Sequence, residues 1–307
     1  MKTLSLVVPV YYEEECIDRF IEETTAELNK INYNWEIVFI DDGSKDRTQE
    51  IIKSYAAKET RIKLIELSYN QGKQAAVTAG IHHAKGDYMI YMDPDLQDPP
   101  DEIPRLIEEI EKGYDLVFGV RKEKMDSFIN KLYSKIFWGI LNRFTGLQIP
   151  KGLAVMRIFN GKFADKFCEY SEQNRFIEGI FIHIGMKRTQ IEIAQRKRFA
   201  GKSKFNFRRK LKLAFDAIFD FSEIPLRLAV SIGIALSIIG FIILIVILFL
   251  KIFVIDFAAG WPSIVAIIIF SLGIQLFFIG IAAIYIGKIY KESKGRPLYS
   301  IKEYTNL

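Results

Sequence analysis

The chain of 307 residues is poor in the side chains that bind soft metals, with two cysteines and three histidines. Neither Cys16 nor Cys168 has a second cysteine or a histidine at ligand spacing, so both are predicted to be reduced thiols without a metal or catalytic role. Two glycine motifs for nucleotides are also missing. No G-x-G-x-x-G follows the first apolar run, and the Gly-Lys-Ser sequence at 201–203 is not a P-loop, because Arg196 replaces the required glycine. These absences argue against hydride transfer by a Rossmann domain and against P-loop ATP hydrolysis.

Charged residues are absent from two long stretches near the C-terminus, 228–250 and 263–286. A helix needs about 20 apolar residues to cross the hydrocarbon core of a bilayer, and each stretch is longer than that. Residues 1–225 instead mix charges with short apolar runs, as globular domains do. The predicted organisation is a globular domain at 1–200, an amphipathic juxtamembrane segment at 201–225, a two-helix transmembrane hairpin at 226–287 and a tail at 288–307.

Basic residues lie at the outer ends of both apolar stretches. Seven Lys and Arg residues lie between 202 and 227, before the first stretch, and four lie between 288 and 296, after the second. The connection between the stretches has only Lys251. By the positive-inside rule, both termini and the globular domain are expected on the cytoplasmic side of the plasma membrane. The apolar run in MKTLSLVVPV is too short, and too soon followed by acids, to predict a signal peptide.

Apolar runs with a period of two alternate with helical patterns through the first 120 residues. This alternation of strands and helices predicts an α/β fold with a doubly wound, mostly parallel sheet. In such sheets the ligand lies beyond the carboxyl ends of the strands. The predicted strands are 4–10, 36–41, 62–67, 87–93 and 115–120, and the predicted helices are 14–30, 46–58, 73–84 and 100–112.

Acidic residues gather at these predicted carboxyl ends. The second strand ends in Asp41 and Asp42, and the fourth ends in Asp93 and Asp95. In an extended chain Asp93 and Asp95 project to the same side, where both can bind one hard cation. Because Mg²⁺ is usually held by one or two carboxylates together with substrate phosphates, the pattern predicts a metal-dependent diphosphate site. Such a site fits the departure of a nucleoside diphosphate.

The chain becomes strongly basic just before the first apolar stretch. Nine Lys and Arg residues lie between 196 and 212, and apolar side chains from Phe207 to Phe219 follow at helical spacing. Such a segment is expected to lie in the headgroup plane of the inner leaflet. Its cations would there meet a lipid-linked phosphate.

Motifs along the whole chain carry a resemblance to one enzyme family. They are VVPVYYEEE, DDGSKDRT, NQGKQAAVTAG, GDYMIYMDPDLQDPP, EKGYDLVFGVR, NRFIEGIFIHIG, RFAGKSKF and YIGKIYKESKGRPLY. Together they resemble the GT-A family 2 polyprenyl-phosphate glycosyltransferases, the group of bactoprenol glucosyltransferases and dolichyl-phosphate mannose synthases. The D-x-D-L-Q and R-x-x-G-x-S-K motifs, followed by two C-terminal spans, are specific to this group. The resemblance implies a GT-A fold and an inverting transfer of a sugar, with UDP-glucose as the expected donor, to undecaprenyl or another polyprenyl phosphate at the cytoplasmic face.

The resemblance also implies roles for individual residues. The residues expected to bind the nucleotide sugar are Pro9, Tyr11, Glu13, Asp41, Asp42, Lys73 and Asp93. Those expected to bind the acceptor phosphate are Arg198, Ser203 and Lys204, and the expected catalytic residues are Asp95, Arg121 and Glu178. Within these sets, Asp42 would contact the nucleobase, Arg121 would hold phosphate, and Asp93 and Asp95 would hold ribose and a metal ion, Mg²⁺ or Mn²⁺. The expected partners are the nucleotide sugar, polyprenyl phosphate and membrane lipids, without nucleic acid, and a homo-oligomer such as a tetramer is left open.

Two alternative functions stay open. The sequence Gln195-x-x-Arg198-Phe199 is close to the Q-x-x-R-W of processive polysaccharide synthases, although two spans are few for an export channel. A catalytically degenerate membrane scaffold is the other alternative. It stays open because related enzymes commonly carry an Asp, proposed as a base, in the segment that corresponds to IPKGLAVMRI, whereas residues 127–164 contain no Asp or Glu.

The missing carboxylate has a chemical explanation if the acceptor is a phosphate. A phosphate monoester has a second pKa of about 6 and is already anionic near pH 7. The acceptor then needs cations that hold two anions together, such as Arg198 and Lys204, more than it needs a base. We expect transfer without a protein base at Val155, and Glu178 is the competing candidate for a base.

Overall fold

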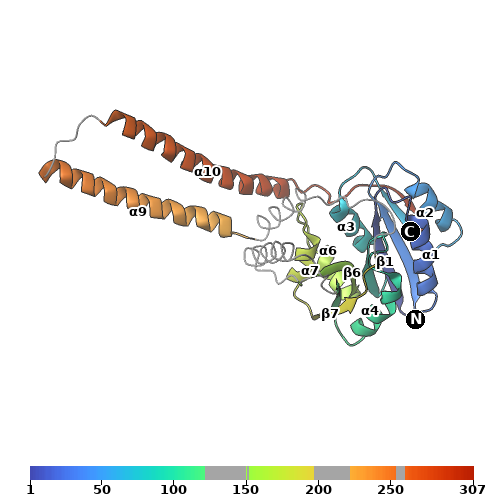
Figure 1. Cartoon of the computed structure of the whole chain (residues 1–307). Helices are drawn as coiled ribbons and strands as arrows, with labels where there is room; N and C mark the ends of the chain where they lie inside the picture. Colours follow the sequence, from blue (N-terminus) through green and yellow to red (C-terminus); the bar gives the residue numbers. More distant parts are fainter. Residues whose placement is uncertain (122–149, 151, 197–221, 254–259) are drawn as a thin grey trace. The chain divides into compact units, whose positions relative to one another are not determined.

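The computed structural model of the chain describes residues 1–121, 150, 152–196, 222–253 and 260–307 (Figure 1). The chain divides into two compact units, Met1–Leu213 with Arg296–Leu307, and Ala214–Gly295. The first unit therefore includes the end of the chain, a return that the sequence analysis did not predict when it assigned 288–307 to a tail.

An eight-stranded sheet forms the centre of the first unit, in the order β7-β5-β6-β4-β1-β2-β3-β8. The strands are β1 (Thr3–Val10), β2 (Asn34–Asp41), β3 (Ile62–Leu67), β4 (Tyr88–Tyr91), β5 (Leu116–Arg121), β6 (Leu153–Asn160), β7 (Arg188–Ile193) and β8 (Ile301–Thr305). Strands β4, β1, β2 and β3 are parallel neighbours, whereas β6 and β8 run antiparallel to the strands beside them. The predicted α/β, mostly parallel sheet is confirmed, and β6, β7 and β8 extend it.

Helices cover both faces of this sheet (Figure 1). They are α1 (Ile17–Leu28), α2 (Thr48–Ala56), α3 (Lys73–His83), the short 3₁₀ helix η1 (Pro100–Glu102), α4 (Ile103–Ile110), α6 (Gly161–Cys168) and α7 (Ile177–His183). Helices α1, α2 and α4 share one hydrophobic cluster with the strands. Helix α3 contacts β1 and β2, and it packs beside α6. The doubly wound arrangement expected from the alternating pattern is therefore present.

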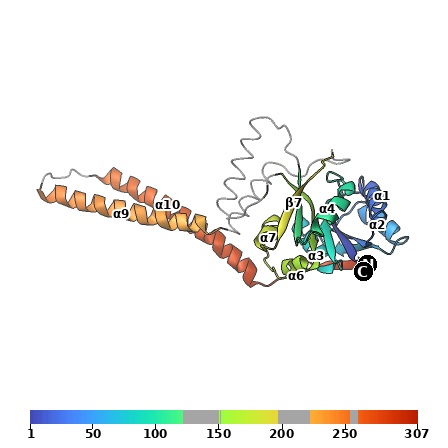
Figure 2. The same cartoon turned by 90° about the horizontal axis from the view of Figure 1, so that it is seen from below.

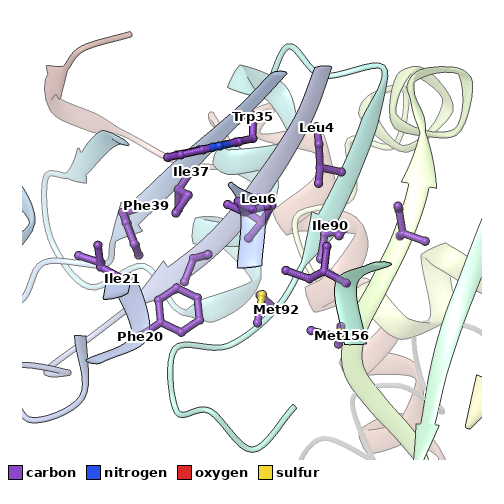
Figure 3. Packing of buried hydrophobic residues seen from close by; sticks show 14 of the residues in the cluster. Leu4, Leu6, Phe20, Ile21, Trp35, Ile37, Phe39, Ile90, Met92 and Met156 are labelled. Atoms are coloured by element: carbon purple, nitrogen blue, oxygen red, sulfur yellow. The ribbon is translucent and has the colours of Figure 1, made fainter. Parts of the chain in front are cut away.

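The apolar pattern of the strands explains why the sheet is buried. In β1 every residue after Thr3 is buried. A parallel strand with both faces covered by helices needs a nearly continuous run of apolar residues, and the β1 sequence provides one. Figure 3 shows alternate residues Leu4 and Leu6 of β1 in the cluster of buried side chains that also contains Phe20 of α1 and Phe39 of β2, and all four are fully buried. Each such side chain contributes about 1.5–3 kcal/mol when it leaves water.

In the residues that the structure describes, the second unit contains two long helices, α9 (Ile224–Phe253) and α10 (Trp261–Ser293). Each contains a window long and apolar enough to cross a membrane, Ile224–Ile243 and Phe270–Ser293, and neither window is buried within the protein. Exposed apolar side chains along these helices, such as Phe241 and Phe277, would be unfavourable in water and suit a lipid environment. The two helices fit the predicted transmembrane pair.

Candidate active site

The predicted donor-binding residues gather along one edge of the sheet. Strands β1, β2, β3 and β4 all end at this edge, because they run parallel. The chain passes from β1 to β2 and β3 on one side and returns to β4 on the other side of β1. The carboxyl edge between β1 and β4 is thus the point where the strand order reverses, and in open α/β sheets ligands bind at such points.

The loops that follow β1 and β2 are tied together by backbone-to-side-chain hydrogen bonds. The Tyr12 amide donates to Ser44 Oγ (3.0 Å), and the Glu13 amide donates to Thr48 Oγ1 (2.9 Å). Tyr12 adopts a positive φ of 54°, which is uncommon for a residue with a side chain. The loop that carries Tyr11 and Glu13 is therefore held in a fixed conformation beside the second loop.

Gly43 allows the second loop to approach the third. It adopts a φ of +75°, and a Cβ atom on it would lie 2.9 Å from the backbone of Tyr69 and Asn70. Only glycine combines this conformation with so close a backbone approach. The requirement explains the glycine of the D-D-G-S motif.

Asp41 and Asp42 have different surroundings at the end of β2. Asp41 is fully buried, and its Oδ2 accepts hydrogen bonds from the Gly43 and Ser44 amides and from Gln49 Nε2 (2.6 Å). Such bonding stabilises the turn itself. Asp42, only 4% exposed, accepts hydrogen bonds from the amides of the third loop, and burial raises its pKa to about 6 despite those bonds.

The D-x-D segment does not continue as an extended strand, so the prediction that Asp93 and Asp95 project to the same side of an extended chain is wrong. Strand β4 ends at Tyr91, and the chain turns at Pro94 and Asp95. The Asp95 Oδ1 atom accepts from the amide of Gln97 (3.0 Å), which closes the turn. Proline cannot donate a ladder hydrogen bond, which favours a strand end here.

A strained residue follows directly in this turn. Leu96 is buried and adopts a φ of 58°, a conformation that costs about 1–2 kcal/mol for a residue with a Cβ atom. Such strain persists only where the surroundings hold it, and it is concentrated at functional sites. The strained conformation of Leu96 therefore indicates that the surrounding structure holds this turn after Asp95 in place.

Asp93 and Asp95 are chemically suited to a hard divalent ion. Asp93 Oδ2 accepts from Lys73 Nζ (2.7 Å), so the first carboxylate already has one cation, whereas Asp95 is buried and fixed by its turn. No group of three or more His, Cys, Asp or Glu residues that could hold a metal alone occurs in the described residues. One or two carboxylates completed by substrate phosphates are the usual Mg²⁺ site, so the residues present fit such an ion.

Arg121 is bound to Asp98, a carboxylate to which the sequence analysis gave no role. Arg121 donates through Nε (2.9 Å) and Nη2 (2.6 Å) to Asp98 Oδ1, and Asp98 Oδ2 accepts from the amides of Val155 and Met156 (both 3.1 Å). This network joins the D-x-D-L-Q-D loop to the ends of β5 and β6. Arg121 is thus fixed beside the D-x-D-L-Q-D loop, and Val155, at the place of the expected base, contributes its backbone amide to the same network.

Arg157 of β6 is a charged residue that sequence reasoning missed. Its side chain is 1% exposed, and its Nε and Nη2 atoms donate to the carbonyl oxygens of Val155 (3.0 Å) and Ala154 (3.2 Å). Glu178 Oε1 of α7 lies 4.0 Å from Nη2. A single arginine in an apolar run gives no sequence signal of burial, because arginine is usually exposed.

Aromatic rings surround the Arg157 guanidinium and join it to the D-x-D loop. The ring centroids lie at 5.0 Å for Phe181, 5.3 Å for Tyr91 and 5.6 Å for Phe118. Tyr91 is also 5.6 Å from Lys73 Nζ, and burial raises the pKa of its hydroxyl. These contacts place Arg157, Tyr91, Lys73 and Asp93 in one connected cluster, with Glu178 at its border.

The predicted acceptor residues Arg198, Ser203 and Lys204 lie outside the described residues, as does most of the predicted juxtamembrane segment. The described chain before them ends at Arg196, whose amide donates to the carbonyl oxygen of Gln97 (2.9 Å). The Arg196 side chain forms ion pairs with Glu23 (2.8 Å) and Asp101 (2.9 Å). The basic segment therefore begins beside the D-x-D-L-Q turn.

Comparisons with known proteins identify the family of the chain. Residues 5–168 match the model of the family described as Glycosyl transferase family 2. The undecaprenyl-phosphate 4-deoxy-4-formamido-L-arabinose transferase of Pectobacterium atrosepticum is 33% identical over 99% of this chain and 94% of its own length. The prophage bactoprenol glucosyl transferase homolog of Escherichia coli K12 is 36% identical over 97% of this chain and 98% of its own length.

A solved structure shares the fold at low sequence identity. Glucosyl-3-phosphoglycerate synthase from Mycobacterium tuberculosis superposes with a TM-score of 0.50 and 17% identity, over 71% of this chain and 79% of that one. At this identity the likeness shows the fold alone, which is the GT-A fold that the sequence analysis expected.

Proposed function

The chain belongs to glycosyl transferase family 2 and is a glycosyltransferase, and from this premise we propose that it transfers a sugar from a nucleotide sugar to polyprenyl phosphate. UDP-glucose is the proposed donor, undecaprenyl phosphate the proposed acceptor, and the anomeric configuration is inverted. The two relatives described above are named for undecaprenyl or bactoprenol carriers and are similar to this chain over nearly its whole length. The apolar windows in α9 and α10 support a membrane-bound acceptor.

The observation that carries this proposal is the hydrogen bond between the Arg196 amide and the Gln97 carbonyl. It anchors the start of the basic segment two residues from Asp95. Arg198 is only two residues further along, so an extended chain places it within about 7 Å of this anchor. Arg198, one of the cations proposed for the acceptor phosphate, thus follows closely in the chain after an anchor beside the carboxylate proposed for the donor diphosphate, which supports the proposal.

In the proposed mechanism the donor lies across the carboxyl edge between β1 and β4. Asp42 accepts a hydrogen bond from the nucleobase. The nucleoside is lined by Pro9, Tyr11 and Glu13, and Asp41 stabilises the turn after β2 that carries Asp42. Lys73 and Asp93 contribute charge beside the ribose and diphosphate. When bound by Asp93 and Asp95, Mg²⁺ or Mn²⁺ would neutralise the diphosphate as it leaves.

The acceptor phosphate attacks without a protein base in this proposal. Its oxygen is already anionic, so Arg198, Lys204 and Ser203 need only hold it against the repulsion of the donor diphosphate. Arg121, positioned by Asp98, adds positive charge at the same edge. Inversion follows from a single displacement on the sugar carbon.

The basic flanks of the two apolar helices support a cytoplasmic orientation of the catalytic unit and both termini, in the plasma membrane. The donor, a charged nucleotide sugar, would then bind from the cytoplasm. The lipid phosphate would be held at the headgroup plane by the segment before α9.

A direct transfer assay tests the proposal. Membranes containing the chain are incubated with undecaprenyl phosphate and a panel of radiolabelled nucleotide sugars that includes UDP-glucose, and lipid-extractable label is counted. We expect one donor to give label that depends on undecaprenyl phosphate, on Mg²⁺ or Mn²⁺, and on Asp95, whereas the control Asp165→Ala, at an exposed position of α6, retains activity. Label in a water-soluble polymer would identify a processive synthase, and no product from any donor would favour a scaffold.

A further inference from the structure

The chain that follows α10 returns to the catalytic unit and extends its sheet. Strand β8 pairs antiparallel with β3, in a register that places Leu64 opposite Thr305 and Glu66 opposite Glu303. Figure 2 shows this C-terminal segment, in red, running to the edge of the sheet. Residues 296–306 are called the return segment below.

Charged and polar contacts hold the return segment in place. Glu66 is 1% exposed, and its carboxylate is paired with Lys302 (3.3 Å) and with Lys53. The Asn306 side chain donates to the carbonyl oxygens of Ala56 (2.7 Å) and Ile62 (3.0 Å). A buried carboxylate without its cations is costly, so these pairs favour the docked strand.

The return segment also contacts the loop after β3 that supports Asp42. Gln71 Nε2 donates to the Ser300 carbonyl oxygen (3.0 Å), and the Ser300 amide donates back to Gln71 Oε1 (2.9 Å). The same Ser300 carbonyl accepts from the Ser68 amide (2.9 Å). The side-chain amide of Gln71 thus forms a closed two-bond pair with the backbone of the return segment.

Gln71 connects the return segment to Asp42, because its side chain bonds to Ser300 and its backbone bonds to Asp42. Its backbone amide donates to Asp42 Oδ1 (2.7 Å), and the neighbouring Gly72 amide donates to Asp42 Oδ2 (3.0 Å). Gly72 adopts a φ of +95°, and glycine has more backbone freedom than any other residue. A loop with this freedom needs an external contact to hold two amides on one carboxylate, and the Ser300 backbone supplies it.

We propose that the return segment positions the donor nucleotide, with Gln71 and Ser300 as the positioning residues that fix Asp42. The inference rests on the proposed function, in which Asp42 binds the nucleobase. Because the segment follows α10, the donor site is completed by chain beyond the second apolar helix. Removing residues 226–307 would consequently damage the donor site as well as the membrane hairpin.

If the return segment had only a structural role, the experiment should give a different result. If β8 only covers the edge of β3, loosening its contact with Gln71 should change stability and leave nucleotide affinity unaltered. If the segment positions Asp42, the same change should weaken nucleotide binding. It should also raise the donor KM more than it lowers kcat, because the reacting groups near Asp95 belong to another loop.

The test compares variants of the full-length protein in detergent. Binding of UDP with Mg²⁺ is measured by calorimetry for the unchanged chain, for Gln71→Ala and for the control Gln190→Ala, an exposed position on β7 at the opposite edge of the sheet. Two lost hydrogen bonds should weaken UDP binding about tenfold in Gln71→Ala. Both the UDP affinity and the donor KM of the control Gln190→Ala should stay within twofold of the values for the unchanged chain.

A second pair of variants separates the backbone contact from folding. Ser300→Pro removes the amide that donates to Gln71, whereas Ser300→Ala keeps it. We expect weaker UDP binding and faster hydrogen exchange at Gln71 and Gly72 in Ser300→Pro alone, with the melting temperature recorded for both. If the unchanged chain binds neither UDP nor GDP, the proposed function fails. If it binds UDP and both Gln71→Ala and Ser300→Pro bind within twofold of it, the inference is overturned.

Discussion

Replacing Asp42 with asparagine is expected to stabilise the catalytic unit near neutral pH and to weaken nucleotide binding. Asp42 is 4% exposed and accepts only backbone amides among the described residues, so its charge is poorly compensated. Burial is the largest cause of its raised pKa, and the neighbouring Asp41 adds to it. A group that is costly for the fold and placed at the edge of a ligand site is typical of a functional residue.

The size of the effect follows from the pKa. The ordinary value for this carboxyl is 3.8 and the folded value is about 6. A difference of about 2 in pKa corresponds to about 3 kcal/mol of lost folding stability when the group is ionised in both states. The asparagine amide keeps one acceptor oxygen but adds a donor without an identified partner, which costs about 1–2 kcal/mol. The net gain expected for Asp42→Asn is about 1–2 kcal/mol at pH 7.5.

The pH dependence distinguishes this cause from others. At pH values well below 3.8 the carboxyl is protonated in the folded and the unfolded chain and costs nothing. Between that value and about 6 the unfolded chain ionises first, so stability falls as pH rises, and the full cost is present above about 6. The advantage of Asp42→Asn should therefore disappear near pH 5.

The assay follows thermal unfolding of both proteins in detergent from pH 5 to 8, together with the affinity for UDP-glucose. This donor is chosen because both phosphates of its diphosphate group are fully ionised throughout that range, so the donor does not titrate. Nucleotide affinity of the unchanged chain should rise with pH and level off above about 6, whereas Asp42→Asn should bind weakly at every pH. A variant that is less stable than the parent at pH 7.5, or a stability difference that is constant with pH, would refute the reasoning.

Three further predictions concern the rest of the site. Asp95→Ala should strongly reduce transfer, and the small residual rate should no longer require Mg²⁺ or Mn²⁺, which titration with EDTA in the lipid-extraction assay will show. Glu178→Gln should retain single-turnover transfer within about tenfold across pH 5.5 to 9, roughly the range around the phosphate pKa; a loss of order 10³ at unchanged nucleotide affinity would make Glu178 the base. Arg157→Met should lower the melting temperature less than Arg157→Ala, because both variants lose the hydrogen bonds to the carbonyl oxygens of Val155 and Ala154 but only Arg157→Ala also leaves a large cavity, for which we expect a fall of roughly 10 °C.

Local patterns in the sequence determined much of the fold. The apolar runs at 4–10, 36–41 and 62–67 became β1, β2 and β3 with changes of at most two residues, because strands buried on both faces need continuous apolar residues. The parallel sheet then followed from the alternation with helices. Since parallel strands end at one edge, the position of Asp42 and Asp95 at the same edge of the sheet was also predictable.

Tertiary structure decided features that have no local signal. The turn at Asp95 depends on the surroundings that hold Leu96 at a positive φ, and the burial of Arg157 depends on aromatic rings from three other elements. The hydrogen bonds between Gln71 and Ser300 join residues 229 positions apart. Composition and periodicity describe a residue and its near neighbours along the chain, whereas these contacts form only when distant segments pack, so the return of the C-terminus to the donor loop was visible only in the folded protein.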